Sequence, residues 1–492
     1  YFHHRSLTIS APFPYWKRGG AVLIGACLIG LCIFGIPGRT GYNPIKVSAA
    51  YFCQDAFLNQ LGVSPTFNLL TSVMDDMRPE NKYLHLMDEQ EAITKAQALL
   101  NRPGDANVSP LAVYRHAAKA DSVQQRRPNV VLIMMESMSA KFMKHFGQSE
   151  TLTPFLDSLY TRSISFRNFY SAGIHTNHGL YATLYSFPAM MKRNLMKGSV
   201  IPRYSGLPTV LKENGYYNLF FMTHEGQYDN MNAFFRTNGY DEVFSQEDYP
   251  ADKVVNSFGV QDDFLYDYAI PVLNQRAATG QPFFATLLSI SNHPPYVIPP
   301  FFHPKTSEPE MQIVEYADWA LRQFFEEARK QPWFDNTIFV LEGDHGKLVG
   351  DAECELPESY NHIPLMIYSS RIQPEEKTAF GGQVDIQPTI LGLLNIDYLQ
   401  NNFGVDLLKE ERPCMFYTAD NMVVGRNDTL LYLYNYETQQ ELTYDIGNGK
   451  LNAVPMDDSF LPLKEYSFSM LQSAEFLVKH GKTLNSIPFT QQ

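Results

Sequence analysis

From residue 129 onward, short apolar runs alternate with longer stretches that have a helical period. Five runs are apolar at nearly every position and predict buried strands: Val130–Met135, Leu219–Met222, Phe283–Ile290, Ile338–Leu341 and Leu365–Tyr368. Between them, amphipathic stretches predict helices near Leu152–Thr161, Leu207–Asn214, Val314–Lys330 and Ile386–Leu394. Strands that are apolar on both faces belong to a sheet covered on both sides. The pattern is therefore typical of an α/β fold with a mostly parallel sheet.

The amino-terminal part has a different pattern. The stretch 19–36 carries no charge and would form a helix about 27 Å long, which is close to the thickness of a bilayer core. We expect a transmembrane helix there, although a buried helix or the apolar region of a signal peptide would share this composition. The upstream flank, residues 1–18, is basic and is predicted to be cytoplasmic. Residues 37–127 predict a helical linker, with one helix at Gln90–Arg102.

The carboxyl-terminal part, residues 411–492, is predicted to be a small β subdomain and a tail. Its stretch 412–447 is rich in tyrosine and interrupted by turn residues, which indicates a small antiparallel sheet.

The composition of the whole chain excludes some classes of protein. With 45% hydrophobic and 18% charged residues the chain is globular, and a formal net charge of −13 argues against a nucleic-acid partner. The five cysteines have no metal-binding or disulfide spacing.

Polar residues follow two of the predicted strands directly. Glu136 ends the run NVVLIMME, and the motif GDHG, with Asp344 and His345, follows the strand TIFVLE. In parallel sheets, reactive groups gather beyond the carboxyl ends of the strands. A carboxylate beside an imidazole suits Mg²⁺, Mn²⁺ or Zn²⁺, so these residues predict a metal site. A carboxylate at a strand end can also be a plain surface residue.

The loop SAGIHTNHG contains a third candidate, Thr176, between His175 and His178. A threonine in front of a helical pattern is often only an N-cap. A threonine hydroxyl is a weak nucleophile until its alkoxide is stabilised, and metal coordination supplies that stabilisation. Thr176 is therefore a candidate nucleophile if it lies at the predicted metal site.

Several motifs occur in the order that one known family shows: NVVLIMMES, LTPFLDSLY, SFRNFYSAG, ISNHPPY and LEGDHG. Over residues 129–408 the chain resembles the lipoteichoic acid synthase family, the phosphoglycerol-transferring branch of the alkaline phosphatase and sulfatase superfamily. The resemblance implies an alkaline phosphatase-like sandwich, with the catalytic domain at residues 128–410 and further membrane helices ahead of this stretch. It also implies one divalent metal, with Mn²⁺ or Mg²⁺ preferred and Zn²⁺ possible. The implied ligands are Glu136, Thr176, Asp344 and His345, with Thr176 as nucleophile.

The resemblance further implies residues that contact the substrate. His293 of SNHPPY is expected to contact the phosphate, and His224 of MTHEG matches a substrate-site histidine approximately. Asn292 and Asn230 are expected to contact the substrate as well. A capping or core role for His293 remains an alternative.

Two departures from the family pattern concern the head group. The family has a Trp-x-Arg pair before a Gly-Tyr-Asp, whereas this chain has Asp229 and Met231 at that spacing. The arginine that would clamp the phosphate is therefore replaced. The second departure is His362 in YNHIPLMIY, where related phosphoethanolamine transferases place a histidine. With His293 also available, we expect either a second metal near His293 and His362 or a histidine-lined pocket in which His362 also contacts the substrate phosphate. A structural role for His362 is the alternative.

The implied reaction moves the phospho-head group of a phospholipid donor, through a covalent adduct on Thr176, to a glycan or lipid acceptor. The implied location is the bacterial inner (cytoplasmic) membrane, with the catalytic domain on the extracytoplasmic, periplasmic side. A phosphoethanolamine transferase, or a phosphodiesterase or phosphatase, would share the same centre, and a silent binding module would share only the fold. Sulfatase activity is disfavoured because no Cys/Ser-x-Pro-x-Arg motif occurs.

Overall fold

The computed structural model describes residues 15–35, 45–53, 56–78, 82–101, 114–117, 127–198 and 201–485. Its centre is an eight-stranded sheet. In spatial order the strands are β5 (Glu242–Phe244), β4 (Tyr217–Met222), β6 (Phe283–Leu288), β2 (Asn129–Met135), β7 (Thr337–Gly343), β8 (Leu365–Tyr368), β3 (Ile164–Tyr170) and β9 (Glu375–Gly382). Only β8 runs antiparallel to its neighbours, so the prediction of a mostly parallel sheet is confirmed.

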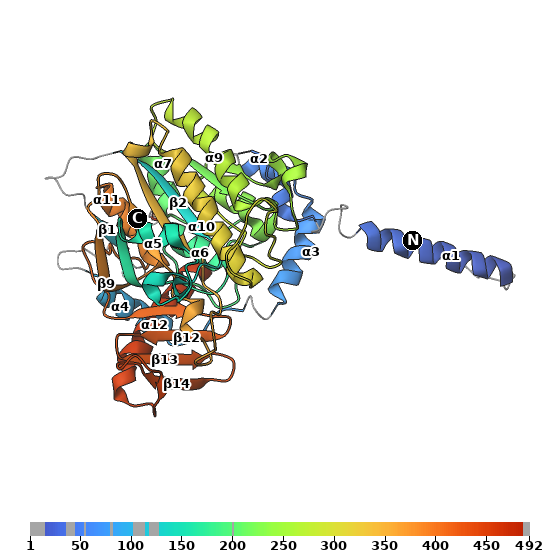
Figure 1. The fold of residues 1–492 in the computed structure, drawn as a ribbon. Coiled ribbons are helices and arrows are strands. Elements are labelled where there is room, and N and C mark those ends of the chain that lie inside the picture. Colours follow the sequence, from blue (N-terminus) through green and yellow to red (C-terminus); the bar gives the residue numbers. More distant parts are fainter. Residues whose placement is uncertain are drawn as a thin grey trace, which may run out of the picture.

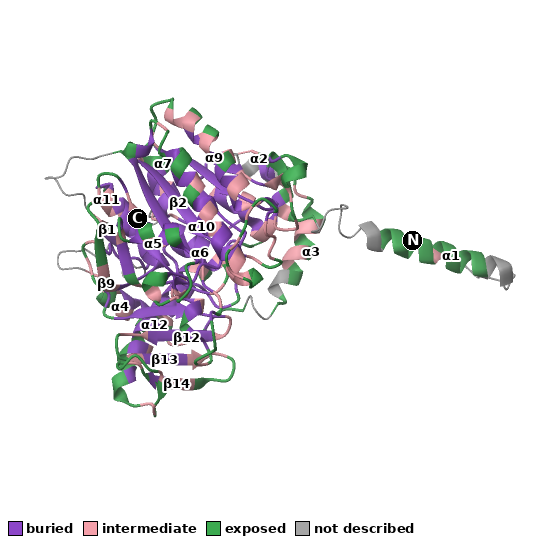
Figure 2. Ribbon diagram, in the orientation of Figure 1, coloured by how far each residue is buried: buried purple, intermediate pink, exposed green. Residues whose placement is uncertain are grey.

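Helices cover both faces of this sheet (Figure 1). One side has α5 (Pro154–Tyr160), α9 (Asp262–Ala277) and α10 (Pro309–Ala328), and the other has α6 (Thr176–Tyr185), α7 (Leu207–Glu213), α8 (Met231–Thr237) and α11 (Ile386–Leu393). Successive residues of β2 point to opposite sides: Val130 and Leu132 join the core under α6, whereas Val131 and Ile133 join the core under α10. The central strands β2, β6 and β7 are buried along their length (Figure 2). This double burial is the reason for the uninterrupted apolar runs.

The carboxyl-terminal part forms a separate antiparallel sheet, as predicted. Its strands are β11 (Met415–Thr418), β12 (Met422–Arg426), β13 (Leu430–Asn435), β14 (Gln440–Asp445) and β15 (Asn452–Ala453). Helix α12 (Leu461–Lys479) follows and packs on this sheet and on α4 (Glu89–Leu100). The sequence interpretation treated the α12 segment as a tail. It missed the helical spacing of Leu463, Tyr466, Met470 and Leu477, all of which are buried.

The amino-terminal part contains α1 (Tyr15–Gly35), α2 (Ala56–Leu61), α3 (Pro65–Asp76) and α4, and a short strand, β1 (Tyr114–Ala117), which pairs with β10 (Tyr398–Asn401). A helix therefore occupies most of the stretch 19–36. Among the residues that the structure describes, no helix combines the length and hydropathy needed to cross a membrane. The transmembrane role of 19–36 stays a prediction, and residues 1–14 of the predicted cytoplasmic flank lie outside the described ranges.

All five predicted strands and all four predicted helices of the catalytic region are present. The strands that sequence patterns missed are polar or short. β9 lies at the edge of the sheet and starts with exposed residues, β5 has three residues, and β3 contains Arg167 and Asn168. Helix α9 was missed as well, and it contains Pro271, which is a helix breaker by local criteria.

Candidate active site

Two adjacent parallel strands bring the predicted metal ligands together. Met135, the last residue of β2, is opposite Gly343, the last residue of β7, so Glu136 and Asp344 leave the sheet side by side. Potential ligand atoms of Glu136, Asp344 and His345 all lie within 4.8 Å of one another. They form the one group of at least three such ligands in the described part of the chain.

Asp344 is held in a fixed orientation. Its Oδ1 accepts hydrogen bonds from the backbone N–H groups of Ser137 (2.8 Å) and His345 (2.7 Å). Its Oδ2 is buried and has no hydrogen-bond partner among the described residues, but lies 3.6 Å from His345 Nε2. A buried carboxylate oxygen without a partner is costly unless a cation binds it. Asp344 therefore fits a metal ligand.

A hydrogen bond to the backbone carbonyl of Gly346 sets the tautomer of His345. His345 Nδ1 lies 2.7 Å from the carbonyl oxygen of Gly346, which can only accept, so the ring proton is on Nδ1. The lone pair of Nε2 is then directed toward the carboxylates, 3.9 Å from Glu136 Oε1. This is the arrangement in which histidine binds a metal through Nε2 while the other ring nitrogen donates to a second group.

Glu136 is buried in a negative environment. Ser289 Oγ accepts from its backbone N–H (3.0 Å), and Ser137 Oγ donates to its Oε1 (2.6 Å). Burial, and next the charge of Asp344, raise the pKa of Glu136 well above its usual range. A divalent cation would remove this repulsion and favour the ionised form. Two carboxylates, an imidazole nitrogen and a nearby hydroxyl thus fit a single divalent metal such as Mn²⁺, Mg²⁺ or Zn²⁺.

Thr176 is the first residue of α6, and the N-cap position belongs to His175, which forms no side-chain cap. The N-cap explanation for Thr176 is thereby excluded. The Thr176 hydroxyl instead donates toward Glu136 Oε2, 3.5 Å away. Near the carboxyl end of α6, Thr183 Oγ1 donates a hydrogen bond to the buried Glu342 of β7 (2.6 Å). This bond joins α6 to the strand that Asp344 directly follows.

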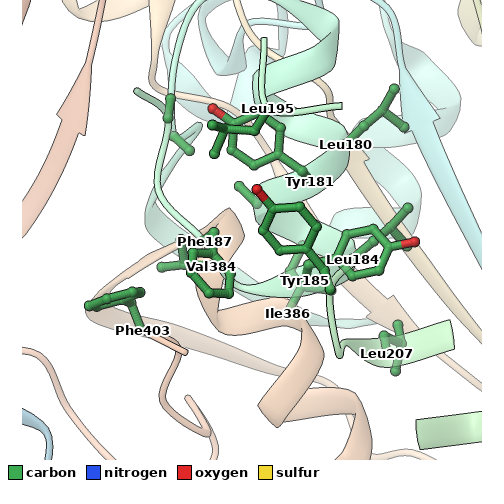
Figure 3. Close-up of a cluster of buried hydrophobic side chains, with 14 of the residues drawn as sticks. Leu180, Tyr181, Leu184, Tyr185, Phe187, Leu195, Leu207, Val384, Ile386 and Phe403 are labelled. Atoms are coloured by element: carbon green, nitrogen blue, oxygen red, sulfur yellow. The ribbon is translucent and has the colours of Figure 1, made fainter. Parts of the chain in front are cut away.

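A large apolar cluster holds α6 from its other side. Figure 3 shows Leu180, Tyr181, Leu184 and Tyr185 of this helix packed among side chains from distant segments. Among these are Phe187, Leu207, Val384, Ile386 and Phe403, all buried. Closely packed side chains resist displacement of the helix that they surround. The packing therefore fixes the position of Thr176 relative to Glu136, Asp344 and His345.

The predicted substrate residues have different surroundings. His293 adjoins the centre: burial lowers its pKa, and the charges of Asp344 and His345 act on it. Its Nδ1 donates to the carbonyl oxygen of Pro294 (2.6 Å). Asn292 supports the ligands, because its amide donates to the backbone oxygens of Glu136 (3.2 Å) and Ser137 (3.1 Å).

His224 and Asn230 lie in the segment that follows β4. His224 is buried against Tyr228, with ring centroids 4.6 Å apart, and burial lowers its pKa. The side-chain amide of Asn230 donates to the backbone oxygen of Met196 (2.9 Å). Between them Asp229 reaches the site: Asn177, which follows Thr176, donates to Asp229 Oδ2 (3.3 Å). Both Asp229 and Asn230 have positive φ, 47° and 67°, a strained conformation that functional loops retain.

His362 lies in another environment than His293. Its Nε2 donates to the backbone oxygen of Arg167 (2.8 Å), and its ring stacks on Tyr170 with centroids 5.1 Å apart. The charges that act on it are those of Glu358 and Arg426, whereas His293 senses Asp344, His345 and Lys347. The structure therefore does not bring these two histidines to one metal-binding group among the described residues.

Sequence reasoning assigned no role to several residues around Thr176. His175 Nε2 lies 2.6 Å from Asp420 Oδ1, which comes from the loop between β11 and β12. His178 is fully buried, neither ring nitrogen has a hydrogen-bond partner among the described residues, and burial lowers its pKa to about 3. Lys347 donates to Asn292 Oδ1 (2.8 Å). The position of His178 two residues after Thr176 is a local signal, but no local pattern indicates Asp420.

Comparisons with known proteins agree with this geometry. The family model described as Sulfatase matches residues 128–396, more than half of the chain. The chain is 24% identical over 315 residues to lipoteichoic acid synthase 2 of Bacillus subtilis (strain 168), covering 58% of this chain and 47% of that protein. The chain spans about half the length of the curated relatives it matches.

Two solved structures share the fold. A protein in the alkaline phosphatase superfamily from Vibrio parahaemolyticus aligns with a TM-score of 0.73 and 26% identity, over 83% of this chain and 100% of that one. The lipoteichoic acid synthase LtaP from Listeria monocytogenes aligns with a TM-score of 0.63 and 20% identity, over 79% of this chain and 98% of that one. The second likeness shows the fold alone.

Proposed function

The chain belongs to the sulfatase family, and from that premise we propose that it is a metal-dependent phosphotransferase with Thr176 as its nucleophile. The observation that carries this proposal is the position of the Thr176 hydroxyl, 3.5 Å from Glu136 Oε2 beside Asp344 and His345. The donor is a phospholipid and the acceptor a glycan or lipid hydroxyl of the cell envelope. Likeness to proteins named lipoteichoic acid synthase supports phosphoglycerol as the transferred group.

Glu136, Asp344 and His345, with the Thr176 oxygen, would hold the metal, which supplies Lewis-acid stabilisation of negative charge when bound. In the first displacement, Thr176 Oγ forms a bond to the donor phosphorus, and the bond from phosphorus to the lipid alcohol breaks. The alcohol leaves with a proton and the head group stays on Thr176 as a phosphodiester. An acceptor hydroxyl then attacks the same phosphorus, and the Thr176 hydroxyl is regenerated with the acceptor's proton.

We propose that His293 lies beside the substrate phosphate, because the charges of Asp344 and His345 act on its ring. Its ring proton is on Nδ1, where it donates to the Pro294 carbonyl. Burial lowers the pKa of His293, so the neutral ring is favoured and its Nε2 can accept a proton from an incoming hydroxyl. Asn292 keeps the backbone of Glu136 in place during the reaction.

We further propose that the helix over 19–36 anchors the chain in the bacterial inner membrane, with the catalytic body on the extracytoplasmic side. The stretch is uncharged, and the large apolar side chains described on α1, from Val22 to Leu31, are largely exposed. An exposed, uncharged helix is stable in lipid and unfavourable in water. Anchoring raises the effective concentration of a lipid donor at the site.

Phosphoethanolamine transfer is a second candidate, and Asp229 favours it. This carboxylate adjoins Asn177 and takes the place of the tryptophan in the family's Trp-x-Arg pair, two residues before Met231, which takes the place of the phosphate-clamping arginine. A carboxylate pairs with an ammonium head group better than with a glycerol. Lys197 already lies 2.8 Å from Asp229 Oδ1, however, so an ammonium group would have to displace it.

The decisive experiment is mass spectrometry of Thr176. Purified full-length chain with Mn²⁺ is incubated with vesicles of phosphatidylglycerol or phosphatidylethanolamine, and the peptide that contains Thr176 is analysed. We expect an adduct with the mass of phosphoglycerol or of phosphoethanolamine, which names the donor. Asp344→Ala abolishes the adduct, whereas Thr94→Ala, an exposed threonine of α4, leaves it unchanged. Unmodified Thr176 with both lipids and bound metal would refute the mechanism.

A further inference from the structure

An unusual apolar surface covers α2, α3 and their flanks. Nine large apolar side chains within residues 45–78 are largely exposed, against six scattered over the described part of residues 82–485. We call the following eight residues the α2–α3 apolar surface: Phe52, Leu58, Leu61, Leu69, Leu70, Val73, Met74 and Met77. Soluble proteins rarely expose apolar side chains in such a group unless another surface covers them.

The orientation of α3 is the reverse of that in a water-soluble domain. Leu69, Leu70, Val73 and Met74 share one face, and each is between 49% and 64% exposed. The polar residues Asn68, Thr71 and Ser72 are turned the other way and are half-buried. In water the apolar face would be expected to pack inward, so this helix is arranged for an apolar environment outside the protein.

Two features identify lipid as that environment. The surface follows α1 along the chain, and α2 and α3 lie at the edge of the body nearest α1 (Figure 1). It also has cations at its border: Lys46 is exposed, and the charges that act on it are those of Lys197 and Arg78 and of the carboxylates Asp229 and Glu225. Apolar side chains beside lysine and arginine match the acyl and anionic head-group layers of a bilayer.

The same segment is tied to the active site. The backbone N–H of Lys46 donates to Gln227 Oε1 (3.0 Å), and Asn232 donates to the backbone oxygen of Tyr51 (2.8 Å). Gln227 belongs to the segment that carries Asp229, which in turn contacts Asn177 and Lys197. The stretch that precedes the apolar surface is thus hydrogen-bonded to the segment 227–232, and Asp229 of that segment contacts the residue that follows Thr176.

We propose that the α2–α3 apolar surface lies in the interfacial layer of a lipid bilayer and holds the entrance beside Thr176 at the level of the lipid head groups. The part that concerns donor delivery rests on the proposed phosphotransfer. A nucleophile at head-group height can reach the phosphorus of a donor whose acyl chains stay in the membrane, so the donor need not be extracted. Lys46 and Lys197 face the donor's anionic group from the side of the surface.

Bromine quenching tests the contact without any reference to catalysis. The full-length variant Leu70→Trp is reconstituted into vesicles of phosphatidylcholine and phosphatidylglycerol, with or without bromine on the acyl chains. Leu99→Trp on α4 is the control, because Leu99 is similarly exposed, at 44%, but lies on α4 beside α12. The three native tryptophans contribute equally to both variants. We expect bromine to reduce the emission specific to Leu70→Trp at least twofold and to leave that of Leu99→Trp unchanged.

The quenching experiment gives a different result if protein, and not lipid, covers the α2–α3 apolar surface. If a second copy of this chain or another protein covers the surface, Leu70→Trp emission shifts to the blue with protein concentration but bromine does not quench it, which overturns the proposal. Equal emission of Leu70→Trp and Leu99→Trp in brominated and plain vesicles overturns it as well.

The link to catalysis has a separate readout. In Leu70→Asp/Met74→Asp we expect the rate of Thr176 modification from vesicle phosphatidylglycerol to fall at least tenfold, while the rate with a water-soluble short-chain phosphatidylglycerol stays at the wild-type value. Leu99→Asp is the matched control and retains both rates. If bromine quenches Leu70→Trp but Thr176 of the wild-type protein is never modified, the phosphotransfer is refuted and the membrane contact stands. Equal losses with both donors would refute the positioning role of the surface.

Discussion

At the scale of single residues, Gly179 decides how closely α6, which carries the proposed nucleophile Thr176, approaches the proposed metal ligands. A Cβ at this position would lie 2.3 Å from the backbone oxygen of Asp344. That oxygen, and the one of Gly343, accept hydrogen bonds from Gln383 Nε2 (2.8 Å and 3.1 Å), so the backbone there cannot move freely. Only a residue without a side chain lets Thr176 reach Glu136.

Gly179→Ala is therefore expected to weaken Mn²⁺ binding and Thr176 modification, each at least tenfold. Alanine favours an isolated helix by about 1 kcal/mol over glycine, but overpacking costs about 1–3 kcal/mol and displaces α6. Isothermal titration calorimetry measures the affinity. Gly25→Ala in α1, where a Cβ meets nothing within 4 Å, is the control and leaves both quantities unchanged. Wild-type affinity in Gly179→Ala would show that the helix tolerates the displacement.

At the scale of elements, Arg412 joins the two parts of the molecule. Its guanidinium is buried and donates to Asp385 Oδ2 (2.9 Å) at the start of α11 and to the hydroxyl of Tyr466 (2.6 Å) on α12. Asp385 is also fully buried, and its carboxylate accepts backbone N–H groups of Gly382 (2.9 Å) and Val405 (2.8 Å). The ion pair thus fixes α11, which packs on α6, against the carboxyl-terminal subdomain.

Arg412→Ala is expected to lower the free energy of unfolding by about 3–5 kcal/mol, because it leaves the Asp385 carboxylate buried without its cation. Urea denaturation followed by circular dichroism measures the change. Arg371→Ala removes an exposed arginine, which donates to Asn336 (3.3 Å), and should change stability by less than about 1 kcal/mol. If the two variants were equally stable, Arg412 would have no part in joining the subdomains.

Asp318 connects α10 with α5 and gives this contact a pH dependence. Its carboxylate accepts from the backbone N–H groups of Phe155 (2.9 Å) and Leu156 (2.8 Å), yet burial raises its pKa to about 7 from 3.8. The folded state therefore retains the proton that the unfolded state releases near pH 3.8. The stabilising contribution is fully present below that pH and is lost as the pH rises through 7.

In Asp318→Asn this contribution cannot titrate, so the denaturation midpoint should depend less on pH between about 4 and 7 than in the wild type. Urea midpoints at a series of pH values measure the slope, with Asp335→Asn, an exposed aspartate, as the matched control. A slope in Asp318→Asn that equals the wild-type slope would assign the proton to another group.

At the scale of the whole molecule, we expect the proposed metal binding to be linked to folding. Burial, and next the charge of Asp344, raise the pKa of Glu136, so the site is unfavourable for two ionised carboxylates without a cation. Since the metal binds only the folded state, Mn²⁺ at about 100 times its dissociation constant stabilises the fold by about 2.7 kcal/mol. We expect the melting temperature to rise by several degrees with Mn²⁺ and to fall on chelation, as measured by calorimetry. Asp344→Ala should show no response, and an equally unresponsive wild type would count against a metal site.

The sequence by itself determined the elements whose signals are local. Buried strands are apolar on both faces, so their runs are visible without a structure, and residues that directly follow such strands must lie at one edge of a parallel sheet. For this reason Glu136, Asp344 and His345 could be grouped before their distances were known. The edge strands β5 and β9 have no such apolar run, because several of their residues are exposed or only half-buried.

Only the tertiary structure decided which residues from distant segments meet. Asp420 reaches His175, and Lys197 reaches Asp229, through the packing of separate elements, and no local pattern encodes such contacts. It also separated His362 from His293. The environment of α3 is also not encoded locally. An apolar stripe in the sequence shows that one face of the helix must be covered, but it does not show whether protein or lipid covers it. Its outward orientation is seen only in the folded chain, and the proposed membrane contact rests on it.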